Sequence, residues 1–563
     1  MELDCGDAFH VSLLSDEMPS PFKRRAQRAR APEFAAAGPM AVPDEAVRER
    51  ADAAPLDWRA ETRVMLLLGL PSILVQGNVF WIWLYNASWA GSHLGIREMA
   101  GVSTANLAGN LTAMSIQYGL IFALETLTSQ AMGGHRHHEV GLLMQRALVC
   151  CAIALIPGYA LWAVMEDLLI ALHQPPDVAA LAARFLRIYS PGLPGLVLFE
   201  LSRRFLGCQD IVLAYIPITV LATWVCHPLL LNFLMTHGFG FDSVPIASAF
   251  TAWALALLAL AYIAIGRPHD ARTWAGVEVR HALTRHGMAH FLRIAVPGVF
   301  TMTEWWFWEV VCACVGALGE EQLASHLIAY SIVPLLVMAP VGISIAIAVR
   351  VGQLIGEGRA RAAKLVAGGA FAAAVATIGA YTLAVALSSR RIIGAFSNAQ
   401  TSAEVIGATR EIWPLVTAFL VLDGIYMTLM GVVRALAFQL RASVCVFVAL
   451  WLVGLPTTFY VAYGTRAGLR GVWAALLPVY ALLNVLCALI VLYADWNRVS
   501  SEVTEEAREE DALDEEQLAA ERAAASAAAL AAASPPRSAP PGAPPCRAWR
   551  SRSRGEPSSA ASA

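Results

Sequence analysis

The sequence has little charge. Asp, Glu, Lys and Arg make up 15% of its 563 residues, whereas a soluble domain carries about a quarter. Apolar residues make up 57% of the chain, and its mean hydropathy is +0.56. A globule of this composition could not cover its surface with polar side chains, so we expect a polytopic membrane protein rather than a soluble, fibrous or disordered one. The formal net charge of −3 also argues against nucleic acid as a partner.

Motifs of cofactor and metal chemistry are missing as well. There is no GxxxxGK[ST] phosphate loop, so the sequence gives no sign of a nucleotide-binding module. The 10 cysteines include no CxxC pair. His135, His137 and His138 share one short loop, which is more typical of a positive cytoplasmic loop than of a metal site. The N-terminus lacks the basic and then apolar pattern of a secretory signal. We expect no metal, no cofactor and no enzymatic activity.

What the chain does contain is a series of apolar runs long enough to cross a bilayer, which takes about 20 helical residues. Twelve spans are predicted, near residues 63–89, 98–123, 141–165, 180–203, 211–235, 243–266, 291–316, 323–348, 364–388, 411–433, 442–463 and 471–494. The expected fold is therefore an all-α polytopic membrane protein.

Arginine and lysine are unevenly distributed over the loops between these spans. The loops after even-numbered spans contain Arg136, Arg203, Arg204, Arg267, Arg272, Arg280, Arg285, Arg350, Arg359, Arg361, Lys364, Arg434 and Arg441. The loops after odd-numbered spans contain Arg97, Arg390, Arg391, Arg410, Arg466 and Arg470, and Arg184 and Arg187 near span four do not reverse the bias. Because short cytoplasmic loops are enriched in positive residues, both termini are expected in the cytoplasm. The membrane can be the plasma membrane, or the membrane of a vacuole or another internal compartment.

Three features recur in the two halves of the chain, 223 to 230 residues apart. They are Pro71 and Pro297, Gln130–Gly133 and Gln353–Gly356, and Arg204 with Gln209 and Arg434 with Gln439. Since six spans return the chain to its starting side, the halves are predicted to be parallel repeats. We expect two six-helix lobes around a central cavity, at 57–270 and 271–498. A disordered arm at 1–56 would precede them, and an acidic, then Ala/Pro/Ser-rich disordered tail at 499–563 would follow.

Five acidic residues stand out within the predicted spans or at their cytoplasmic ends, and a charge inside the membrane costs on the order of a few kcal/mol. Glu125 and Glu200 lie toward cytoplasmic ends beside arginines, which favours local ion pairing. Glu304, Glu309 and Asp423 lie deeper, with no basic residue at the same depth of their own span. A buried carboxyl group tends to hold its proton and can exchange it for a cation. The alternative is a hydrogen-bonded structural acid.

The seventh span concentrates this chemistry. Glu304 and Glu309 are five residues apart, about 140° around an ideal helix, so both can face one cavity only if the helix bends. Pro297, about two turns earlier, could bend it. Trp305, Trp306 and Trp308 lie in the same stretch, and aromatic faces beside carboxylates suit a bulky organic cation. Tryptophan is also common at membrane interfaces and in plain packing.

These residues resemble the multidrug and toxic compound extrusion (MATE) transporters, most closely the eukaryotic branch, from about Pro71 to Trp496. The stretches that carry the resemblance are Asn110–Ser115, Ala123–Gly133, Pro191–Gln209, Glu304–Glu309 and Met338–Gly356. The fourth of them matches an EWWxxE signature of the seventh span.

The resemblance implies which residues line the cavity or take part in proton coupling: Glu304, Glu309, Asp423, Asn110 and Tyr330. Trp305 is added to this set because an aromatic face beside carboxylates suits an organic cation. The first span offers Gln76, Asn78 or Asn86 as its polar member, with Asn78 ranked first. It lacks the Asp of bacterial relatives, and Ser331 stands after Tyr330 where some relatives have Glu.

We therefore expect a secondary transporter that exports organic cations, drugs or metabolites by antiport, with the proton as coupling ion and no obligate protein partner. The alternative is a lipid-linked sugar flippase of the same superfamily, although glutamates paired with tryptophans argue against it. A membrane-embedded enzyme would need His or Asp clusters near one interface, and a structural membrane protein would not need three deep acids.

Overall fold

The structure is a computed structural model that describes residues 55–395, 402–465 and 467–506, together with Asp52 and a few isolated positions between 508 and 526. Within these residues every regular element is helical. Ten of the described helices are long and apolar enough to cross a membrane. The predicted disordered arm and tail lie almost entirely outside the described residues.

The first six spans are α3 (Trp58–His93), α4–η2–α5 (Ile96–Gly109, Asn110–Met114, Ser115–Gly133), α6 (His137–Ala163), α8–η3–α9 (Pro176–Tyr189, Ser190–Gly192, Leu193–Gly207), α10–η4–α11 (Tyr215–Val220, Leu221–Cys226, His227–Thr236) and α12 (Ser243–Gly266). The last six are α14–α15 (Arg285–Thr301, Thr303–Gly316), α16 (Glu320–Gly356), α17 (Ala360–Leu387), α19 (Ala403–Ala435), α20–η7–α21–η8 (Gln439–Val446, Phe447–Gly454, Leu455–Phe459, Tyr460–Gly464) and α22 (Gly468–Leu492). Short elements join them: α7 (Met165–Ala171), η5 (Gly240–Asp242), η6 (Ala271–Thr273), α13 (Val279–Ala282) and α18 (Ser389–Ala395).

Two of the twelve predicted spans, four and seven, are not among these ten described helices. Span four changes from α8 to α9 through η3 at Pro191. Span seven is interrupted at Met302, between α14 and α15, and Pro297 lies inside α14. This break lies five residues after the proline and before both glutamates, so Glu304 and Glu309 lie on the same unbroken helix, α15, and the expected bend does not lie between them.

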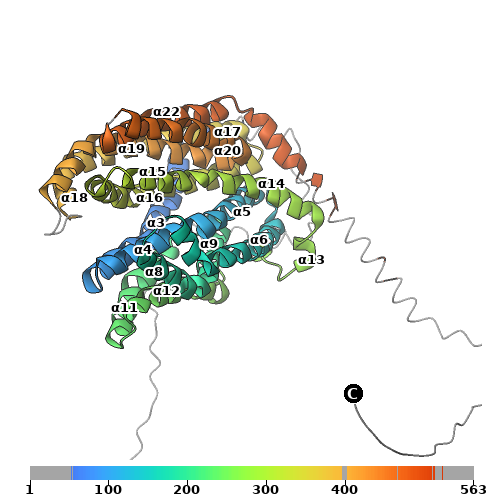
Figure 1. The fold of residues 1–563 in the computed structure, drawn as a ribbon. Coiled ribbons are helices and arrows are strands. Elements are labelled where there is room, and N and C mark those ends of the chain that lie inside the picture. The colour runs from blue at the N-terminus through green and yellow to red at the C-terminus, as the bar shows by residue number, and fades with distance from the viewer. Residues whose placement is uncertain are drawn as a thin grey trace, which may run out of the picture.

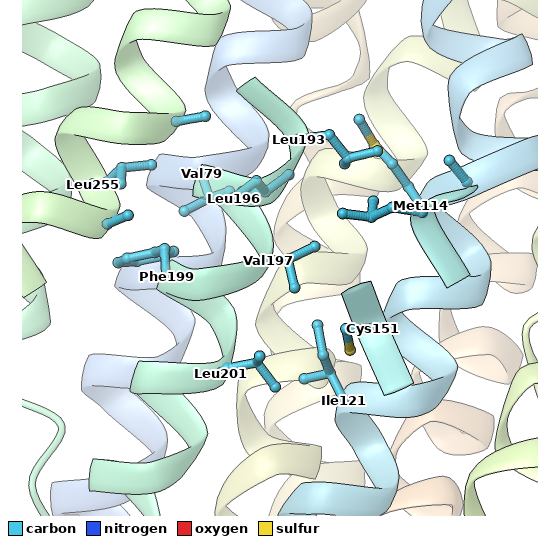
Figure 2. Packing of buried hydrophobic residues seen from close by; sticks show 14 of the residues in the cluster. Val79, Met114, Ile121, Cys151, Leu193, Leu196, Val197, Phe199, Leu201 and Leu255 are labelled. Carbon is cyan, nitrogen blue, oxygen red and sulfur yellow. The ribbon is translucent and has the colours of Figure 1, made fainter. Parts of the chain in front are cut away.

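The helices form two lobes (Figure 1). The first lobe, α3 to α12, has one buried apolar core, and the second lobe, α14 to α22, has another around α15, α16, α19 and α22. Figure 2 shows part of the first core, where Leu193, Val197 and Leu201 of α9 face the side of Ile121 and Phe199 faces the side of Leu255. Residues four apart share a helix face, so Leu193, Val197 and Leu201 form one apolar stripe of α9, while Phe199 lies on another face of the same helix.

The two lobes contact each other in a reciprocal way: α3 packs on α16, and α5 packs on α14. A Cβ on Gly119 of α5 would lie 2.4 Å from the Val299 Cα of α14, and a Cβ on Gly342 of α16 would lie 2.6 Å from the Ile73 Cα of α3. The first and second spans of each lobe thus contact the second and first spans of the other lobe, as expected for parallel repeats. The π-helical segments η4 and η7 begin at residues 221 and 447, again 226 residues apart.

The ends of α5 and α16 lie at the side of the molecule that the arginine pattern assigns to the cytoplasm. Arg350 of α16 forms a two-pronged ion pair with Glu61 of α3, with both N–O distances 2.7 Å. In the linker between the lobes, hydrogen bonds from Arg272 lower the pKa of Asp270 to about 2. Residues 496–506 form a further helix, which buries Trp496 against the second lobe.

The residue at which one lobe passes into the other, near 270, stays a prediction. Phe291 and Ile294 of α14 belong to the apolar core of the first lobe. The start of span seven therefore packs across the boundary.

Candidate functional site

The short helix α15 carries both acids of the seventh span. It begins directly after the break at Met302, so Glu304 lies in its first turn. Trp308 follows four residues later on the same face, and its Nε1 donates to Glu304 Oε1 at 3.1 Å. The Tyr480 hydroxyl of α22 donates to the same oxygen at 2.7 Å and accepts from Trp308 at 2.8 Å. Glu304 is 3% exposed, so both donors hold a buried carboxyl group in place.

Glu309 and Asp423 complete a set of three buried acids in the second lobe. Glu309 Oε1 accepts a hydrogen bond from the Tyr330 hydroxyl of α16 at 3.0 Å, while Oε2 has no partner among the described residues. Asp423 of α19 is buried and lies within electrostatic reach of Glu304. Within the described part of the chain none of the three forms an ion pair, which agrees with the sequence argument.

Aromatic rings surround these acids. The Trp308 ring lies 4.9 Å from Phe419, 5.8 Å from Trp473 and 6.4 Å from Tyr330, between ring centroids. Such a cluster presents ring faces and hydrogen-bond donors next to carboxylates, which is the chemistry that binds organic cations. Tyr480, Phe419 and Trp473 were missed in the sequence, although a search for polar or large aromatic side chains in span twelve would have found the first and last.

The other predicted site residues lie elsewhere. Trp305 points to the lobe interface, where its ring meets Tyr118 of α5 at 5.7 Å. Asn78 of the first lobe is held by span five: its Nδ2 donates to Thr219 Oγ1 at 3.1 Å, and its Oδ1 accepts from Trp224 Nε1 at 2.9 Å. Asn110 begins the π-helical segment η2, also in the first lobe. The structure therefore groups Glu304, Glu309, Asp423 and Tyr330 and places the remaining three apart.

Glu125 and Glu200 form the local ion pairs that the sequence favoured. Glu125 pairs with Arg204, and Glu200 pairs with Arg203, all four being fully buried. Arg204 and its counterpart in the repeat, Arg434, approach the ring of Phe122 at 5.2 and 4.5 Å. Both ion pairs lie within the first lobe, and the contact of Arg434 of α19 with Phe122 of α5 joins the two lobes.

The first lobe contains a small cavity of about 40 Å³, whose polar lining includes Asn86, Asn106 and Ser248. No carboxylate lines it. Within the described residues no group of three or more His, Cys, Asp or Glu side chains could hold a metal ion.

Sequence comparison decides the family. The profile of the MatE family matches residues 71–234 and 297–460. The chain belongs to the MatE family. The two matches start 226 residues apart, so the MatE profile recognises each lobe once. The predicted MATE resemblance is confirmed, and with it a multi-pass membrane transporter that is not an enzyme.

Known MatE relatives match most of the chain. An uncharacterized transporter of Schizosaccharomyces pombe is 30% identical over 470 residues, which cover 82% of this chain and 85% of that protein. Human multidrug and toxin extrusion protein 1 is 28% identical over 454 residues, covering 80% and 78%. The crystal structure of the eukaryotic MATE transporter AtDTX14 matches with a TM-score of 0.75 at 23% identity, over 79% of this chain and 99% of that one. The twelve-helix, two-lobe fold is thereby confirmed.

Proposed function

We propose that this MatE transporter exports small organic cations in exchange for protons, and that the exchange takes place in the second lobe. The observation that supports this most directly is the set of three buried acids, Glu304, Glu309 and Asp423, without a basic partner among the described residues. An ionised carboxylate in a low-dielectric site needs a compensating positive charge. A proton or a cationic substrate can supply it.

The surrounding donors fit both states. Tyr480 and Trp308 donate hydrogen bonds to Glu304, which stabilise its ionised form while a cation is bound. The rings of Trp308, Phe419 and Trp473 would accept the apolar part and the charge of an organic cation. Proton and substrate then compete for the same carboxylates, and competition of this kind is what couples two opposite fluxes.

The lobe arrangement supports a defined direction. In the first lobe, the described residues of the small cavity carry no acid. The lobes hold each other through the ion pair of Arg350 with Glu61 and through hydrogen bonds such as Gln130 Nε2 to Ala435 O at 3.0 Å and Gln439 Nε2 to Thr126 Oγ1 at 2.9 Å. Because the loops at this end carry most of the arginines, we propose that it is the cytoplasmic end and that it is closed in this conformation.

The proposal is tested with the purified full-length chain in proteoliposomes. A panel of organic cations, neutral metabolites and organic acids is offered under an imposed pH gradient, an imposed sodium gradient or neither. We expect uptake of organic cations only when the pH gradient is imposed, in exchange for protons. This uptake should be abolished when an ionophore collapses the pH gradient. Equal uptake driven by sodium at fixed pH, or uptake of organic acids alone, would contradict the proposal.

A further inference from the structure

A histidine lies next to the Glu309 pair, outside the set of residues described so far. His326 is on α16, one helical turn before Tyr330, and its side chain is 0% exposed. Its ring stacks on the Tyr330 ring with centroids 5.8 Å apart and packs against Trp473 at 5.7 Å. The Tyr330 hydroxyl donates to Glu309. Glu309, Tyr330 and His326 therefore form a series of neighbouring side chains, in which His326 lies nearest the Gly319 end of α16.

The hydrogen bonding of His326 differs from that of the other fully buried histidine among the described residues. His227 of α11 has both ring nitrogens paired, Nδ1 with Thr251 Oγ1 at 2.9 Å and Nε2 with Asn86 Oδ1 at 2.8 Å. In the described part of the chain, neither nitrogen of His326 has a partner. A buried polar group without a partner costs about 1–3 kcal/mol. A structural role therefore explains His227, whose hydrogen bonds compensate for its burial. It does not explain His326, because an apolar ring in the same place would avoid this cost.

The surroundings of His326 restrict what could bind it. The side chain is closed off from solvent, so in this conformation no molecule can reach the ring, whereas a proton can pass to it along a hydrogen bond once the ring turns toward a donor or acceptor. Glu309 Oε2 lacks a partner as well. The titratable and charged residues of the surrounding helices include Glu304, Glu309, Cys312 and Cys314 on α15, Glu321 and Tyr330 on α16, Tyr381 on α17, Glu404, Arg410, Glu411, Asp423 and Tyr426 on α19, and Arg470, Tyr480 and Cys487 on α22.

We propose that His326 is a fourth proton-binding residue of the second lobe and exchanges its proton with Glu309 by way of the Tyr330 hydroxyl. An N–H bond of the imidazolium breaks as Tyr330 accepts that proton, and the hydroxyl proton of Tyr330 forms an O–H bond on the Glu309 carboxylate. Both end groups become neutral, and the total charge is unchanged. The ring must leave its stack on Tyr330 to donate, so the transfer accompanies a conformational change. This inference rests on the proposed proton antiport and deepens it.

The first test observes the proton directly and does not depend on transport. Full-length protein labelled with ¹⁵N-histidine is placed in lipid nanodiscs, and the ring nitrogen signals are followed from about pH 5 to pH 8, the range in which histidine titrates. Both His326→Gln and His326→Asn are prepared to assign the signal, so that a folding failure of one leaves the other. We expect the His326 signal to titrate and its midpoint to move by about one pH unit in Glu309→Gln, since a neighbouring carboxylate changes proton affinity about tenfold. The His227 signal should not respond. No titration of His326, or no response to Glu309→Gln, would overturn the proposal.

The second test compares the pH profile of substrate exchange for His326→Gln with that of the parent and of His227→Gln. We expect His326→Gln to change the shape of the profile, with a loss of about tenfold on one side of pH 6.5 and little change on the other. The control His227→Gln should lower protein stability and keep the parent's profile. A uniform loss at every pH in His326→Gln would mean that the histidine is structural. If the parent shows no proton-driven exchange at all, the proposed function fails, and the nitrogen titration still decides the role of His326.

Discussion

Gly356 of α16 lies so close to Gln130 of α5 that a Cβ added to it would be 2.0 Å from the Gln130 carbonyl oxygen. The reciprocal contact places Gly133 of α5 against Gln353 of α16, where an added Cβ would be 1.9 Å from the carbonyl oxygen. These four residues are one of the repeated motifs of the sequence. The repeat therefore specifies how the lobes meet, because glycine lets two helix backbones come together where any side chain would separate them.

Replacing Gly356 with Ala should open this contact. An overlap with backbone atoms cannot be relieved by a rotamer change, and we expect it to cost about 1–3 kcal/mol in the closed arrangement. In a background whose one cysteine is Cys208, a buried neighbour of Gln353, maleimide labelling from the cytoplasmic side should become roughly fivefold faster or more. Gly379→Ala on α17, where no atom lies within 4 Å of the added methyl group, is the control. Equal labelling of both variants would contradict this role of Gly356.

Replacing Glu125 with Gln should destabilise the protein more than it impairs transport. The change leaves Arg204 buried without its partner, and breaking a buried ion pair costs roughly 3–5 kcal/mol. We expect a lower Tm in detergent but exchange per inserted molecule closer to the parent's than in the second-lobe acid variants. Glu411→Gln removes an exposed pair with Arg470 and should change stability by about 1 kcal/mol at most. A parental Tm for Glu125→Gln would rule out the ion-pair account.

Replacing Tyr480 with Phe should slow exchange. The hydroxyl joins Glu304 and Trp308, and hydrogen bonds to charged groups contribute about 1.5–3 kcal/mol, so we expect a loss of roughly tenfold in exchange rate. Tyr493→Phe, at the exposed end of the same helix, should behave like the parent. If both variants are equally active, Tyr480 has no part in the site.

Both termini should be in the cytoplasm. The arginine asymmetry and the even number of spans give this orientation, and the buried charges at the ends of α5, α9 and α19 lie at the same side. Epitope tags on either terminus should resist protease added to intact cells and be cleaved after permeabilisation. Cleavage without permeabilisation would reverse the orientation.

The span pattern, the repeat and the three acids could be predicted from the sequence because they depend on composition and spacing along the chain. Contacts between distant spans could not. Trp305 and Trp308 looked equivalent, yet consecutive helical residues point about 100° apart, so Trp308 shares a face with Glu304 while Trp305 meets Tyr118. Which face of α15 turns inward is decided by its packing against several helices, among them α16 and α22, and contacts of this kind also explain why Tyr480 was not anticipated.

The most direct test of the account is proton-driven exchange by Glu309→Gln and Asp423→Asn, normalised to the protein inserted in proteoliposomes. Both changes keep side-chain volume and hydrogen bonding but remove the group that alternates between a proton and a cation. We predict normal insertion with exchange abolished in both, and exchange weakened or abolished in Glu304→Gln, while Glu411→Gln stays active. Parental exchange rates for both Glu309→Gln and Asp423→Asn would show that these acids are structural and would contradict the mechanism.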